Sequence, residues 1–263
     1  MNEKINFNDK LKSTNIIVAL GFFLLAIFID LFLEEFGFNS DIGTDLAYVI
    51  FIVLMLIWLR NTSGMKEKFL ETFDFKIWKD VIYVFLLTTF IEYLFNIFLS
   101  ERIFFETSYN VSLYDPLSLC IISTVIFTPI AEELFFRGIL FNRLNLFFSK
   151  QKRGLFMSIF ITTFLFAMAH GIEDGFIIFL TSFPFCTLYL KYDNIFVSML
   201  LHTITNLSVM FSLVLYSYDI INIDGIICDS TSLSLIFSLL GIISIFLMIR
   251  YLIKDYKLIK RNM

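Results

Sequence analysis

The residues best suited to chemistry are two histidines and a carboxylate, each set in apolar sequence. His170 and His202 are the two histidines of the chain, and His202 stands four residues before Asn206, so these two share one face of a helix. Glu132 lies in another apolar segment. A carboxylate, two imidazoles and an amide can activate a water molecule and stabilise an oxyanion. The carboxylate and the imidazoles could equally bind zinc, so both chemistries stay open.

The apolar segment around Glu132 carries two further charges. Glu133 and Arg137 are four residues apart with the glutamate first, which is the favoured order for an ion pair along a helix. Glu132 lies about 100° around the helix from Glu133 and has no such partner. Its carboxylate is therefore available as a general base or acid. The alternative is an ordinary helix end whose charges reach the cytoplasm, which the nearby Arg143 would allow.

Other catalytic arrangements lack their sequence signatures. The chain has no HExxH pair and no serine in a nucleophile-elbow setting. Its three cysteines are too few, and odd in number, for a disulfide framework. We expect two of them, Cys120 and Cys186, to be small buried hydrophobic residues.

The composition indicates a chain whose main solvent is lipid. Of the 263 residues, 58% are hydrophobic and 17% are charged, whereas soluble proteins have roughly 25% charged residues. A disordered chain is excluded by this hydrophobicity, and the net charge of −4 argues against nucleic-acid binding. Unbroken apolar runs without alternation predict an all-α membrane protein. No linker divides the chain, so we expect residues 1–263 to form a single integral membrane domain.

A helix needs about 20 mostly apolar residues to cross a bilayer. This criterion predicts about eight transmembrane helices, of which the second, fifth and sixth are short. They are Asn15–Leu33, Leu46–Leu59, Val81–Leu99, Leu117–Phe136, Leu155–His170, Phe176–Leu190, Ile195–Tyr216 and Leu233–Ile253.

Basic residues are distributed very unevenly between the two sides of these spans. With the predicted helices, 19 of the 20 lysines and arginines fall on one side. Cytoplasmic loops carry the excess of lysine and arginine, so both termini should be cytoplasmic. The phenylalanine-, isoleucine-, asparagine- and lysine-rich composition suggests an AT-rich, bacterial gene.

Two prolines and one further polar pair lie within the predicted spans. Pro129 and Pro184 should kink their helices. Glu92 and Asn96 are one helical turn apart and could form an interhelical hydrogen bond or line a cavity. We favour the structural role for this pair.

Three short motifs resemble the CPBP family of intramembrane proteases, also called the Abi or CAAX-protease family. The family pattern is EExxxR, FxxxH and HxxxN in that order. In this chain the pattern reads Glu132-Glu133-xxx-Arg137, Phe166-xxx-His170 and His202-xxx-Asn206. The resemblance covers residues 116–213, which would form the catalytic core of a CPBP-like helical bundle.

The resemblance implies hydrolysis of a peptide bond in a membrane-associated peptide or protein. Glu132 with His170 would activate the attacking water, and His202 with Asn206 would stabilise the oxyanion. Glu133, Arg137 and Phe166 would be supporting residues. If the reaction uses zinc, then Glu132, His170 and His202 are the expected ligands, with a water in the fourth position. We slightly favour the metal-free glutamate mechanism.

If His170 and His202 belong to one site, the helices that carry them must meet a geometric requirement. His170 lies fifteen residues into its span, or about 22 Å, and His202 lies seven residues into its own, or about 10 Å. The two must nearly meet, so the fifth span must begin further out or the helices must tilt or kink.

Two readings other than a protease remain. A catalytically silent scaffold would regulate a membrane partner such as a sensor kinase, or would act in self-immunity to a bacteriocin. A transporter with a proton relay is disfavoured because the two halves show no inverted repeat. The sequence does not indicate an oligomeric state.

Overall fold

The computed structural model describes residues 5–36, 40–99, 121–217, 220, 223, 226–227 and 230–262. Every regular element within these residues is a helix, apart from an isolated bridge between Asn6 and Ser63. The predicted all-α class is confirmed. Cys120 and Cys228 lie outside the described residues.

The N-terminal part is a series of helices that ends in a long apolar one. The elements are α1 (Phe7–Ser13), α2 (Ile16–Glu35), α3 (Ser40–Leu59), α4 (Met65–Glu71) and α5 (Phe75–Leu99).

The C-terminal part begins with a helix of mixed winding and ends with the longest helix. The elements are η1 (Ser123–Phe127), α8 (Thr128–Glu133), η2 (Leu134–Phe141), α9 (Asn142–Phe147), α10 (Gly154–Met168), α11 (Gly171–Thr181), α12 (Phe183–Tyr192), α13 (Ile195–Ser217) and α15 (Thr231–Asn262).

Four segments of the described residues are long and apolar enough to cross a membrane. They are Phe75–Phe98, Gly175–Tyr192, Ile195–Leu215 and Thr231–Arg261, and two shorter apolar helices cover Asp45–Leu59 and Gly154–Met168. These segments correspond to six of the predicted spans, but the expected number of about eight is not confirmed. The protein is therefore a multi-pass, all-helical membrane protein.

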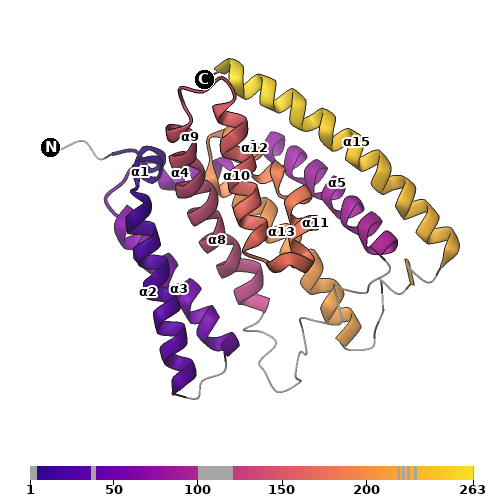
Figure 1. Cartoon of the computed structure of the whole chain (residues 1–263), viewed down its shortest axis with the longest axis horizontal. Coiled ribbons are helices and arrows are strands. Elements are labelled where there is room, and N and C mark those ends of the chain that lie inside the picture. Colours follow the sequence, from indigo (N-terminus) through magenta and orange to yellow (C-terminus); the bar gives the residue numbers. More distant parts are fainter. Residues whose placement is uncertain are drawn as a thin grey trace.

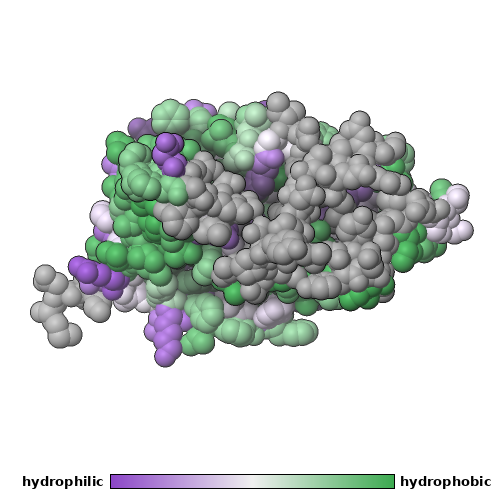
Figure 2. All heavy atoms as spheres, turned by 90° about the horizontal axis from the view of Figure 1, so that it is seen from below, coloured by the Kyte–Doolittle hydropathy of each residue, from purple (hydrophilic) through white to green (hydrophobic). Residues whose placement is uncertain are grey.

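The exposed surface of the helices carries many large apolar side chains, more than is usual for a protein in water. On α15 one stripe faces away from the bundle, and its members are more than half exposed: Leu235, Leu239, Ile242 and Phe246. Figure 2 shows apolar side chains along the flanks of the molecule. Large exposed apolar surfaces of this kind mark contact with lipid or partners.

The helices form one bundle in which α2 and α3 pair at one side, and α15 runs alongside α5 at the other side (Figure 1). The α5–α15 contact is unusually close. A Cβ placed on Gly241 would lie 2.4 Å from Leu94 Cβ and 2.7 Å from the carbonyl oxygen of Phe90. Glycine at position 241 therefore allows the two backbones to approach each other.

The two prolines that we expect to kink their helices each lie in the first turn of a helix. Pro184 lies in the first turn of α12, directly after α11 ends at Thr181. Pro129 lies in the first turn of α8, directly after the π-helix η1. A second π-helix, η2, follows α8 at once. Such π segments occur frequently at functional sites, and these two enclose Glu132 and Glu133.

The segments that carry most of the basic residues meet at one end of the bundle, the upper end in Figure 1. Hydrogen bonds and an ion pair join them, between Phe7 and Ser63, Thr14 and Arg143, Lys68 and Asn194, Asp80 and Tyr192, and Lys191 and Asp255. The charge asymmetry of the sequence therefore corresponds to one face of the folded protein.

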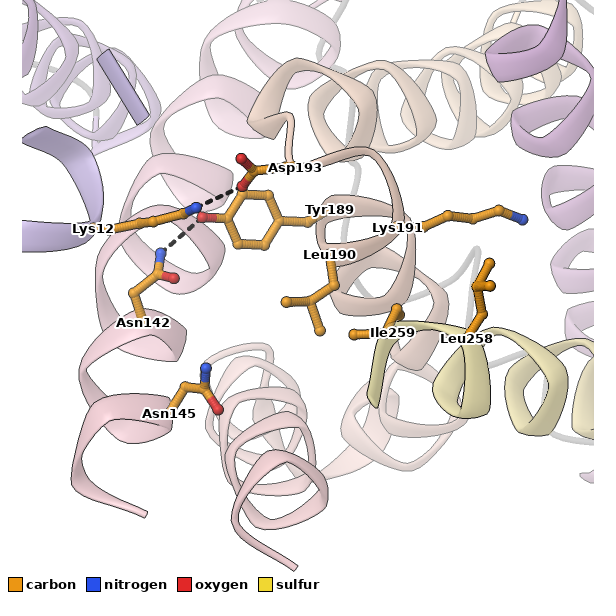
Figure 3. A pocket seen from close by; sticks show the side chains of 9 residues that line it. All are labelled: Lys12, Asn142, Asn145, Tyr189, Leu190, Lys191, Asp193, Leu258 and Ile259. Atoms are coloured by element: carbon orange, nitrogen blue, oxygen red, sulfur yellow. Dashed lines mark hydrogen bonds and ion pairs between the residues drawn. The ribbon is translucent and has the colours of Figure 1, made fainter. Parts of the chain in front are cut away.

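A cavity of about 390 Å³ opens at this basic end between α1, α9, α12 and α15. Figure 3 shows Lys12 paired with Asp193, and Asn142 hydrogen-bonded to Tyr189. The Asn142 amide also donates to the carbonyl oxygens of Arg137 and Gly138. This cavity is lined by a different set of residues from the histidine cluster.

Candidate active site

The two adjacent glutamates of α8 point to different partners. Glu133 is completely buried, whereas the Glu132 side chain is 12% exposed. The two side chains point in different directions because successive residues are about 100° apart around a helix. Glu133 therefore joins the core of the bundle, and Glu132 lies in a partly open space.

Glu133 forms a fully buried ion pair with Arg137. Arg137 Nη1 donates to Glu133 Oε1 over 2.8 Å, and neither side chain is exposed. The predicted pairing along the helix is therefore present. The alternative of an ordinary helix end with charges reaching the cytoplasm is wrong for these two residues, because tertiary packing encloses them.

The guanidinium of Arg137 lies between two aromatic rings. Its Cζ is 4.2 Å from the ring centroid of Phe166 and 5.0 Å from that of Phe185. Two of its nitrogens, Nε and Nη2, have no hydrogen-bond partner in the described part of the chain. Cation–π attraction between the guanidinium and the two rings is stronger away from water. It offsets part of the free energy that these two nitrogens lose by having no hydrogen bond.

His202 connects the ion pair to Glu132. Its Nδ1 lies 3.1 Å from Glu133 Oε1, and its Nε2 lies 3.8 Å from Glu132 Oε2. A carboxylate oxygen only accepts, so Nδ1 is the donor in the first contact. Glu133 thereby fixes the orientation of the ring, as a carboxylate partner commonly does for a catalytic or metal-binding histidine.

His170 is held at the junction between α10 and α11. Its Nδ1 lies 2.8 Å from the carbonyl oxygen of Phe166, one turn earlier. Gly171 follows with a φ of +88°, a left-handed conformation that suits glycine and turns the chain. His170 Nε2 therefore points toward Glu132 Oε2, at 3.9 Å.

The structure thus brings both histidines to one carboxylate oxygen. Glu132 Oε2 is buried and has no hydrogen-bond partner in the described residues. The turn between α9 and α10 lies at the upper edge of the bundle in Figure 1, so α10 begins far out. The early start of α10 explains how His170, fifteen residues into its predicted span, can meet His202, which is seven residues into its own.

Phe166 packs against Arg137 and both histidines. It is 3% exposed, and its ring centroid lies 4.6 Å from that of His170 and 5.8 Å from that of His202. The same ring covers Arg137. Phe166 therefore fixes the relative positions of the two imidazoles.

Asn206 lies one turn beyond His202 on α13. Its Nδ2 donates to the carbonyl oxygen of Thr124, in η1, over 2.8 Å. This bond ties α13 to the π-helix that precedes α8. Nδ2 carries a second hydrogen, so the proposed role in oxyanion binding stays a prediction.

Two residues of this region have no signal in the sequence. Tyr48 of α3 donates its hydroxyl hydrogen to Glu132 Oε1 over 3.3 Å. Phe185 of α12 packs against His202, with 5.4 Å between the ring centroids. Phe185 is one of 35 phenylalanines and Tyr48 lies 84 residues before Glu132, so no local pattern could identify them.

The residues around Glu132 fit zinc by type. Two imidazole nitrogens and a carboxylate are a usual ligand set for catalytic zinc, with a fourth position open to water. Glu132 Oε2, an acceptor without a partner in the described residues, faces both imidazoles. No group of three or more His, Cys, Asp or Glu side chains among those residues already has the spacing of a metal site.

Comparison with known proteins gives one result for the same region. Residues 115–208 match the family model described as Rce1-like, type II CAAX prenyl endopeptidase. No curated protein and no solved structure matches the chain. The matched segment contains both glutamates, both histidines, Arg137, Phe166 and Asn206. This segment is therefore similar to the CPBP/CAAX protease family.

Proposed function

We propose that the protein is an intramembrane endopeptidase that hydrolyses a peptide bond of a membrane-associated peptide or protein. The observation that carries the proposal is the approach of two imidazoles to one glutamate oxygen. Glu132 Oε2 lies 3.9 Å from His170 Nε2 and 3.8 Å from His202 Nε2. The family match supports protease activity independently of this geometry.

Glu132 and His170 would activate the attacking water. Their 3.9 Å separation is longer than a direct hydrogen bond but short enough for one water to contact both groups. Since the Phe166 carbonyl engages Nδ1 of His170, Nδ1 carries the hydrogen and Nε2 presents its lone pair. Glu132 would accept the proton from the water and later deliver it to the departing amine.

His202 and Asn206 would stabilise the oxyanion that forms at the substrate carbonyl. Protonated on both nitrogens, His202 would donate Nδ1–H to Glu133 and Nε2–H toward the oxyanion. Asn206 would offer the Nδ2 hydrogen that Thr124 does not use. Arg137 would keep Glu133 in place through its buried ion pair.

A zinc-assisted form of the same reaction uses the same residues. Glu132, His170 and His202 would hold the ion, and bound zinc would polarise the carbonyl and lower the pKa of its water. Metal analysis of the purified wild type and of His170→Ala decides between the two forms. One equivalent of zinc that is lost on substitution would indicate the zinc-assisted form, and a metal-free active wild type would exclude it.

The substrate we propose is membrane-anchored and not prenylated. The family description names a prenyl CAAX endopeptidase, but the composition suggests a bacterial gene, where prenylation is not expected. Candidate substrates are a peptide leader, a bacteriocin-like peptide or a membrane-anchored signalling protein.

The test compares cells that express the wild type with cells that express Glu132→Gln, His170→Ala or His202→Ala. Mass spectrometry of the membrane fraction maps new N-termini. We expect termini that appear with the wild type and disappear with all three variants, because removal of a general acid or base costs about 10²–10⁴-fold.

A matched control is Glu92→Gln, which changes another carboxyl group within an apolar span, on α5. This variant should retain the wild-type termini. If all variants yield the same termini as the wild type, the protease proposal is wrong. A cellular phenotype that survives in the Glu132 variant would then favour the scaffold reading.

A further inference from the structure

The helix α3 reaches the candidate site from outside the segment that carries the family motifs. It lies before residues 115–208, yet it packs against both α8 and η1. Tyr48, half-buried on α3, donates its hydroxyl hydrogen to Glu132 Oε1 over 3.3 Å. The site of the proposed reaction therefore includes a group from the N-terminal part of the chain.

The two oxygens of Glu132 have different surroundings. Oε1 accepts from Tyr48, which is the one hydrogen bond that the described residues provide to this carboxylate. Oε2 has no hydrogen-bond partner among them and faces the two imidazoles. Rotation about the last torsion of a glutamate is soft, so a contact to one oxygen decides where the other oxygen points.

We propose that Tyr48 is a positioning residue that holds Oε1 of Glu132 so that Oε2 faces His170 and His202. This inference rests on the proposed protease function and adds to it a residue that lies outside the family motifs. The hydroxyl acts through Glu132, because a carboxylate that is already oriented has less freedom to lose when it takes up the proton of the water.

The placement of Tyr48 is itself fixed by contacts of α3. One turn earlier, Asp45 accepts a hydrogen bond from the hydroxyl of Ser123 in η1. Further along the same face, Phe51 and Met55 are buried, and the ring of Phe51 packs against that of Phe135, directly beyond α8. A polar contact and an apolar contact therefore hold α3 against the helix that carries Glu132.

A purely structural role would give a different result on substitution. If the Tyr48 hydroxyl only satisfies its own hydrogen bonding, its removal would affect the stability of the bundle and leave the turnover number unchanged. If the hydroxyl orients the catalytic carboxylate, its removal must lower the turnover number of a folded enzyme. The two roles therefore separate in a comparison of kcat, KM and thermal stability.

The variant Tyr48→Phe removes the hydroxyl and retains the ring. The probe is a fluorogenic peptide that contains the cleavage site mapped as described above, with the enzyme reconstituted in vesicles. We expect kcat to fall ~10–100-fold with KM unchanged, since a hydrogen bond to a charged group contributes ~1.5–3 kcal/mol. Unchanged kcat in folded Tyr48→Phe overturns the proposal.

The matched control is Tyr192→Phe, which removes a hydroxyl that donates to Asp80 over 2.6 Å at the basic end of the bundle. This variant loses a comparable hydrogen bond that does not involve Glu132. Its kcat should equal that of the wild type. An equal fall in kcat for both variants would show that any lost tyrosine hydroxyl impairs the enzyme, and the proposal would be wrong.

A double-mutant cycle, measured by thermal unfolding, tests the contact between Tyr48 and Glu132 without an activity assay. The wild type, Tyr48→Phe, Glu132→Ala and the double variant are melted in detergent. We expect the shift caused by Tyr48→Phe to be smaller in the Glu132→Ala background, because the partner is already missing. Additive shifts would overturn the contact. If the effects of the two substitutions are coupled but the protein cleaves no membrane peptide, the contact between Tyr48 and Glu132 stands. The proposed protease function is then wrong.

Discussion

Arg137 and Glu133 form an ion pair of 2.8 Å in which neither side chain is exposed. The same glutamate oxygen contacts His202 Nδ1 at 3.1 Å. The pair therefore joins the helix of the two glutamates to α13, and it links the stability of the bundle to the orientation of a histidine at the site. Four predictions follow from this and other contacts.

Replacement of Arg137 by methionine should destabilise the protein strongly. It leaves the Glu133 carboxylate buried without its cation, and the loss of one partner of a buried pair costs about 3–5 kcal/mol. Thermal unfolding in detergent measures the effect. The control is Lys12→Met, since Lys12 pairs with Asp193 where the two side chains are 38% and 57% exposed, and such a pair contributes about 0–1 kcal/mol. Equal losses of stability in the two variants would contradict the importance of burial.

Replacement of Phe166 by leucine should lower both stability and activity. The ring of Phe166 contacts Arg137, His170 and His202, so its loss leaves all three less constrained. We expect about 1–3 kcal/mol of lost stability and a fall in kcat. Phe164→Leu is the matched control, because Phe164 lies on the same helix and is 47% exposed, against 3% for Phe166. Wild-type turnover in Phe166→Leu would show that the ring does not position the histidines.

Replacement of Gly241 by alanine should weaken the contact between α5 and α15. The new Cβ would lie 2.4 Å from Leu94 Cβ, and the two helices would have to separate at a cost of about 1–3 kcal/mol. Thermal unfolding again gives the measurement. Gly21→Ala on α2 is the control, since none of the described residues has an atom within 4 Å of a Cβ there and alanine favours the helix. A melting temperature that is unchanged in Gly241→Ala would indicate that α15 does not pack on α5 this closely.

The end of the bundle that carries the basic residues should lie in the cytoplasm. A reporter inserted in the turn between α9 and α10, at Lys150, or fused after Met263, should therefore be cytoplasmic. A reporter inserted before Ser40, at the start of α3, should be on the opposite side. The same reporter on an unrelated membrane protein of known orientation provides the control. A cytoplasmic signal at Ser40 would reverse the predicted orientation.

Local sequence predicted the helices of this protein well. The expected span Leu155–His170 corresponds to α10, Gly154–Met168, and the expected span Ile195–Tyr216 corresponds to α13, Ile195–Ser217. Pro184 lies where α11 ends and α12 begins, and Pro129 lies where the π-helix η1 changes to the α-helix α8. These features depend on hydrophobicity, helix periodicity and proline geometry, which act within one segment of chain.

The sequence by itself determined which residues are candidates for chemistry, because charged and imidazole groups are rare in an apolar chain and the ion pair of Glu133 with Arg137 follows from helix geometry. Tertiary structure alone decided that this pair is buried, that Glu133 also contacts His202, and that Tyr48 reaches Glu132. These contacts join helices that are far apart in sequence. Their distances depend on how side chains pack between helices, which the periodicity of a single helix does not encode.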